Sequence, residues 1–80
     1  MASSMADLAS LAQSLRDNEA FQAALSAIRS EALENLAILP ALETEGIRNN
    51  QATVRVVDEL RANLAGFIRA GQERKPLGIA

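Results

Sequence analysis

The sequence contains no cysteine, histidine, tryptophan or tyrosine among its 80 residues, and each absence excludes a class of site. Without cysteine the chain has no disulfide framework and no thiolate ligand. Without histidine or cysteine a transition-metal site would need carboxylates alone, and the usual nucleophilic triads would have no base. We therefore expect no metal, no cofactor, no catalytic residue and no enzymatic activity.

Excess charge and long hydrophobic runs are also missing. The formal net charge is −2, which argues against a protein that coats nucleic acid by charge alone. No apolar run approaches the roughly 18 residues that span a bilayer. The first seven residues lack the basic and apolar regions of a secretory signal. We expect no membrane partner and no secretion by a signal peptide.

Aliphatic side chains supply most of the apolar content, since 49% of the residues are hydrophobic and only 2% are aromatic. They recur at helical spacing in three segments, which predicts helices over about residues 5–15, 18–39 and 45–70. We find no strand pattern and no internal repeat. The sequence therefore predicts one small all-α domain over residues 1–80.

Residues that favour helix ends lie at the borders of these segments. Ser4 precedes the first apolar stripe as a capping residue, and either Asp17 or Asn18 suits the N-cap of the second helix. Pro40 disfavours a helical conformation in the residue before it, so the second helix should end there. Gly71 suits the position just after the third helix.

The short connection between the second and third predicted helices indicates that they pack antiparallel as a hairpin. The first helix would cover one open side, and residues 71–80 would follow as an extended tail because Pro76 and Gly78 prevent a helix there. The packed seam of the hairpin is predicted to consist of Phe21, Leu25, Ile28, Leu36, Ile47, Val54, Val57, Leu64 and Ile68.

Two polar residues fall on the predicted seam of the third helix. Asn50 could fix the register of the helices there, as asparagine does in coiled coils. The alternative, which we favour, places Asn50 at an exposed position in the first turns of the helix. We expect Arg61 to lay its aliphatic stem over the edge of the seam and to keep its charged head in water.

Clusters of like charge offer the remaining candidates for binding chemistry. Glu31 and Glu34 share a helix face and could hold a hard cation, but a solvated face is the interpretation that we favour. Arg69, Arg74 and Lys75 could touch phosphate near the end of the third helix. Nucleic acid is thus an alternative partner that we do not favour.

Apolar surface should remain exposed on a hairpin of this size, because a core so small seldom stabilises a chain by itself. We expect self-association or docking onto a partner protein, the alternative being a marginally stable monomeric bundle. The residues predicted to contact a partner are Leu8, Leu11 and Leu15 of the first helix and Leu77 and Ile79 of the tail.

Four segments between residues 15 and 69 resemble short proteins encoded in the packaging and head region of tailed-phage and prophage genomes. These segments are Asn18-Glu19-Ala20-Phe21, Ile28-Arg29-Ser30-Glu31-Ala32-Leu33, Ile47-Arg48 and Val56-Val57-Asp58-Glu59-Leu60-Arg61-Ala62-Asn63-Leu64. The resemblance implies a small α-helical hairpin that works with the head, portal or packaging apparatus, and it brings no catalytic motif.

The expected function is therefore that of a non-enzymatic structural or assembly protein of a phage-like particle. Such a protein would be found in the virion or in the host cytoplasm and would bind partner proteins or further copies of itself. One alternative is an oligomeric DNA-packaging factor similar to a small terminase. Another is a bacterial regulatory or chaperone-like binding module.

Overall fold

The computed structural model describes residues 4–73. These residues form three α-helices, which are α1 (Met5–Arg16), α2 (Glu19–Ile38) and α3 (Thr44–Glu73). No strand occurs between residues 4 and 73. The predicted all-α class is confirmed.

Short polar side chains cap the first two helices. The Ser4 hydroxyl accepts a hydrogen bond from the Asp7 backbone N–H at 3.0 Å, and the Asn18 side-chain oxygen accepts one from the Phe21 N–H at 2.8 Å. Each bond satisfies an amide that has no partner within its own helix. Of the two N-cap candidates for α2, the structure selects Asn18, while Asp17 is the C-cap of α1.

The two longer helices end differently from one another. Leu39, the C-cap of α2, has an extended backbone (φ −69°, ψ 134°), as expected for a residue that precedes proline. In contrast, α3 runs through Gly71 to Glu73, three residues past the predicted end. Assigning Gly71 to the position after the helix was wrong, since no described glycine has a positive φ. Residues 74–80 of the predicted tail lie outside the described residues.

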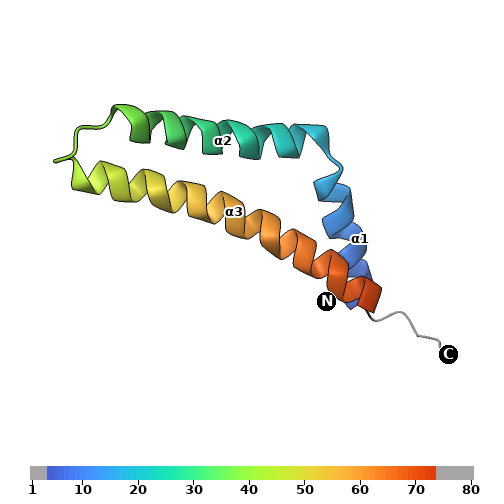
Figure 1. The fold of residues 1–80 in the computed structure, drawn as a ribbon. Helices are drawn as coiled ribbons and strands as arrows, with labels where there is room; N and C mark the ends of the chain where they lie inside the picture. Colours follow the sequence, from blue (N-terminus) through green and yellow to red (C-terminus); the bar gives the residue numbers. More distant parts are fainter. Residues whose placement is uncertain (1–3, 74–80) are drawn as a thin grey trace.

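Helices α2 and α3 lie side by side and run in opposite directions, joined by the short segment 39–43 (Figure 1). Helix α1 turns away from the start of α2 and packs against the C-terminal end of α3, which it contacts more extensively than α2. A small core of Ala12, Leu64 and Ile68 forms where α1 crosses α3, and Phe21 packs against it. Residues from opposite ends of the chain thus share this core.

Most of the predicted seam lies between the helices. Leu25, Val57, Leu64 and Ile68 are buried, whereas Phe21, Leu36, Ile47 and Val54 are half-buried. Ile28 contradicts the prediction, because its exposed fraction is 49%. The physical reason is that Ile28 lies at the edge of the α2 stripe, where no third helix covers the pair.

The interpretation of Asn50 as an exposed residue is wrong. Asn50 is half-buried between α2 and α3, where its side-chain oxygen accepts a hydrogen bond of 3.1 Å from the Asn35 amide. Its own amide donates to the Gly46 carbonyl at 2.8 Å. Because α2 supplies a second amide at this level, the polar group is satisfied inside the interface. This pair therefore favours one register of α2 on α3.

Candidate protein-interaction surface

One flank of the α2–α3 pair carries a groove lined almost wholly by apolar side chains, which we call the apolar groove. It is open to solvent along its length. Its lining consists of Leu25, Ile28, Ala52, Thr53, Val56, Val57 and Leu60. The contribution from α3 repeats at the three- and four-residue spacing of a helix face, so the sequence of this helix builds one wall continuously.

The apolar groove has a buried floor and exposed walls. Leu25 and Val57 pack between the helices and form the floor. Ile28 on α2 and Val56 and Leu60 on α3 form the walls, and the exposed fraction of Val56 reaches 60%. Branched aliphatic side chains clustered in this way, and left in contact with water, favour the binding of another apolar surface.

The other flank of the same helix pair is closed by polar contacts. Arg29 meets Asp58 through two hydrogen bonds, with Nε 2.9 Å from Oδ1 and Nη2 3.3 Å from Oδ2. Hydrogen bonds from the Arg29 guanidinium lower the pKa of the Asp58 carboxyl below its ordinary value, and the positive charges of Arg29 and Arg61 act in the same direction. Asp58 in turn raises the pKa of Arg29. An ion pair and hydrogen bonds thus join the helices along this flank.

Arg61 extends the polar flank toward the N-terminal end of α2. Its guanidinium donates to the Ser26 hydroxyl at 2.9 Å and to the Gln22 carbonyl at 3.5 Å. Arg61 is half-buried, and its charged head reaches two oxygen acceptors of α2 at the edge of the helix pair. The helix pair consequently has one flank joined by polar contacts and one flank that carries the apolar groove.

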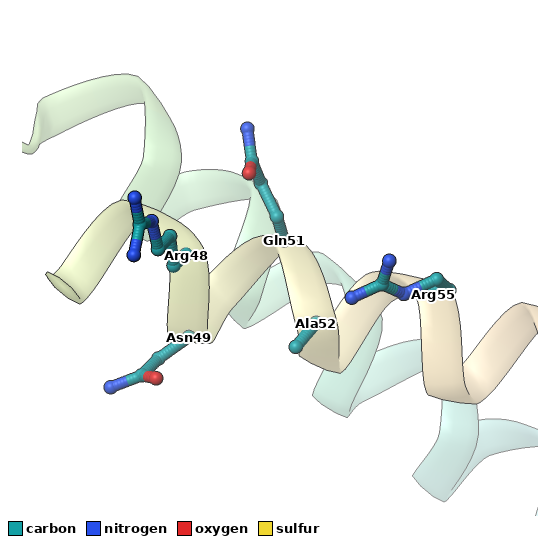
Figure 2. A pocket seen from close by; sticks show the side chains of 5 residues that line it. All are labelled: Arg48, Asn49, Gln51, Ala52 and Arg55. Atoms are coloured by element: carbon teal, nitrogen blue, oxygen red, sulfur yellow. The ribbon is translucent and has the colours of Figure 1, made fainter. Parts of the chain in front are cut away.

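A strip of polar side chains lies beside the apolar groove on the first half of α3. It is lined by Arg48, Asn49, Gln51, Ala52 and Arg55, and it shares Ala52 with the groove. Figure 2 shows Arg48, Gln51 and Arg55 projecting to the same side of the helix. Guanidinium and amide groups in a row can donate hydrogen bonds to carboxylates or to phosphates.

The leucines of α1 that were predicted to contact a partner do not line the apolar groove. Leu11 and Leu15 are exposed, while Leu8 is half-buried. The other two predicted contact residues, Leu77 and Ile79, lie outside the described residues. What the prediction missed is Val56 and Leu60 as groove walls, although both stand beside the α3 stripe in the sequence.

The acidic pair Glu31 and Glu34 is exposed on α2. Within residues 4–73, no group of three or more acidic, histidine or cysteine side chains comes together as a metal site would require. None of the described helices is both long enough and apolar enough to cross a bilayer. The apolar groove and the polar strip are the two surfaces of the α2–α3 pair that we consider as candidate binding surfaces.

Comparison of the chain with family models, with curated protein sequences and with solved structures finds no match in any of the three.

Proposed function

We propose that the chain is a non-enzymatic assembly protein that binds another protein through the apolar groove. The observation that carries the proposal is the groove itself, with three large aliphatic side chains exposed over a buried floor. Its shape is an open channel between two antiparallel helices, which suits the apolar face of another helix. The opposite flank is joined instead by the Arg29–Asp58 pair and by the hydrogen bonds of Arg61.

The strength of such binding follows from the area available. Full burial of an exposed aliphatic side chain is worth about 1.5–3 kcal/mol, so covering three that are already partly buried contributes about 3–4 kcal/mol. Association itself costs about 4–15 kcal/mol in lost freedom of motion. The apolar groove alone therefore supports weak binding, and a specific complex needs the polar groups along its edges as well.

We propose further that the assembly is a phage-like particle, in the virion or in the host cytoplasm. This step rests on the resemblance of residues 15–69 to the short helical proteins of the phage head and packaging region. A small helix pair with an exposed apolar groove on one flank suits a component that joins larger proteins. The proposal requires no reaction chemistry from the chain.

The test is sedimentation of the tagged protein with phage-like particles from cells that produce them. Replacing Val56 by glutamate places a charge in the wall of the apolar groove and should abolish sedimentation with the particles. The matched control is Leu33→Glu, because Leu33 is 43% exposed on α2 but lies outside the groove. Equal loss in both variants, or no loss from Val56→Glu, would contradict the proposal.

A second candidate function is that of a DNA-packaging factor, and the polar strip is the observation that favours it. The side chains of Arg48, Gln51 and Arg55 project to one side of α3, where they would contact successive phosphates of a DNA strand. DNA affinity should then fall steeply with salt, and each lost phosphate contact should reduce the slope by about 1. Affinity unchanged in Arg48→Gln and Arg55→Gln would exclude this candidate.

A further inference from the structure

We propose that α1 is a hinged arm, which opens about Asn18 to form one continuous helix with α2 and so uncovers the end of α3. The structure shows the closed form, in which α1 is docked on α3 (Figure 1). The inference concerns a different part of the surface from the apolar groove and does not depend on the proposed function. It is carried by the backbone at the bend, by the side chains that α1 buries and by the spacing of its leucines.

One backbone angle makes the bend between α1 and α2. Asp17 lies in the right-handed helical region (φ −87°, ψ −2°), and the φ of Asn18, at −82°, also suits a helix. Only the ψ of Asn18, at 112°, is extended. Rotation of this angle toward the helical value of about −42° would bring the two helices into line. A hinge works in this way, since a few residues between helices absorb the whole motion.

The bend also leaves backbone groups that a continuous helix would pair. In the closed form the Asn18 side chain accepts a hydrogen bond of 2.8 Å from the Phe21 N–H, and the Leu15 carbonyl accepts one of 3.1 Å from the Asn18 N–H. In the open form the amides of Glu19, Ala20 and Phe21 would reach carbonyls four residues earlier, as in any α-helix. The backbone thus gains hydrogen bonds on opening, and the docking of α1 on α3 opposes the motion.

That docking buries little of α1. Ala12 is the one residue of α1 that is buried, and it packs against Leu64 and Ile68. The larger side chains of Leu11 and Leu15 remain 58% and 41% exposed. Because stabilisation by burial grows with apolar area, a helix held chiefly by an alanine is weakly held. A segment with few buried contacts is one that opens locally while the rest of the fold stays intact.

The leucines of α1 continue the seven-residue pattern of α2. In one continuous helix they would lie on the face that α2 turns toward α3, because residues seven apart share a face. Every member of the pattern from position 22 onward is buried or half-buried in the structure. The two lines of the pattern are Leu11, Asn18, Leu25, Ala32 and Leu39, and Leu8, Leu15, Gln22, Arg29 and Leu36.

Opening would change which apolar side chains the protein presents. Leu64 and Ile68, now 7% and 6% exposed, would lose the cover that Ala12 and its neighbours on α1 provide. The contacts between α2 and α3 farther along the pair would remain. Helix α1 therefore controls access to the apolar end of α3.

The first experiment measures opening through the reactivity of an introduced thiol, since the chain has no cysteine of its own. Ile68→Cys places the thiol beneath α1, and Val57→Cys, buried between α2 and α3, is the matched control. Each is combined with Asn18→Ala, which favours a helix through this position, or with Asn18→Gly, which favours the cap. The alanine variant should react about tenfold faster at position 68 than the glycine variant, and equally fast at position 57.

The second experiment measures the geometry of the open form with spin labels on cysteines placed at Asp7 and Ser30, which are exposed on α1 and α2. Gly71→Ala is added to weaken the closed form, because the new Cβ would collide with Ala9. With Asn18→Ala, the labels should then move to a separation of about 35 Å, as a continuous helix with a rise of about 1.5 Å per residue requires. With Asn18→Gly, this distance should be absent.

Equal reactivity at position 68 in the alanine and glycine variants would overturn the inference. A parallel rise at position 57 would overturn it too, because the whole fold would then be opening. So would a label separation that stays at its closed value when Asn18→Ala and Gly71→Ala are combined. Faster reaction at position 68 alone, together with the longer separation, is the result that we expect.

Discussion

Two glycines of α3 provide a matched test of how α1 packs, because the same replacement should have opposite effects at the two positions. Alanine favours a helix over glycine by about 0.5–1 kcal/mol. A Cβ added at Gly66 would meet no atom within 4 Å, so Gly66→Ala should stabilise the fold by about that amount. A Cβ added at Gly71 would collide with the Cβ of Ala9 on α1.

The cost at Gly71 follows from which atoms collide. Both Cβ atoms are fixed to helical backbones, so no side-chain rotation relieves the overlap and α1 itself must shift. Overpacking of this kind costs about 1–3 kcal/mol. After the gain in helix propensity is subtracted, Gly71→Ala should destabilise the fold by about 1–2 kcal/mol.

Urea unfolding followed by circular dichroism measures both effects, at one fixed protein concentration because association would shift the midpoint. Ala9→Gly combined with Gly71→Ala should relieve the collision, so the double variant should be more stable than the sum of the single changes by at least about 1 kcal/mol. A Gly71→Ala protein as stable as Gly66→Ala would refute the close packing of α1 on α3.

Three further changes test the interior and the polar contacts. Leu64→Ala should lower the free energy of unfolding by about 2–5 kcal/mol in urea, because it empties part of the small core. Asp58→Asn should reduce the loss of stability in acid, which unfolding at a series of pH values would show. The pKa of Asp58 is lower in the folded state, so its pair with Arg29 stabilises the fold above the ordinary pKa of 3.8, and this stabilisation is lost as the pH falls through the lowered pKa. Asn50→Ala should cost about 1 kcal/mol in thermal unfolding, because the Asn35 amide loses its acceptor.

The sequence predicted those parts of the fold that depend on local interactions. A cap such as Ser4 acts within one turn, and Pro40 restricts only the residue before it, so the starts of α1 and α2 and the end of α2 could be placed to within a residue. The end of α3 could not. Glycine commonly follows the end of a helix, which is why Gly71 was assigned there. In the structure Gly71 lies within α3, where its lack of a Cβ allows Ala9 of α1 to approach closely.

The apolar groove was harder to predict, because a residue there is exposed only if no other helix packs over it. Ile28 has the spacing of a seam residue, and only the absence of a third helix along that flank of the described structure leaves it exposed. Asn50 was misjudged because its partner, Asn35, lies on a different helix. In the sequence, Val56 and Leu60 widen the apolar face of α3 on one side, but only the structure shows that this side is uncovered.

The crossing of α1 over the end of α3 also limits when the core between these two helices can form during synthesis. Ala12 has no core to enter until Leu64 and Ile68 have been synthesised, since these are the side chains that enclose it. During translation the first helix emerges well before its docking site exists, and a lone segment of 12 residues is too short to remain helical in water. Helix α1 therefore lacks its main docking surface until α3 has left the ribosome.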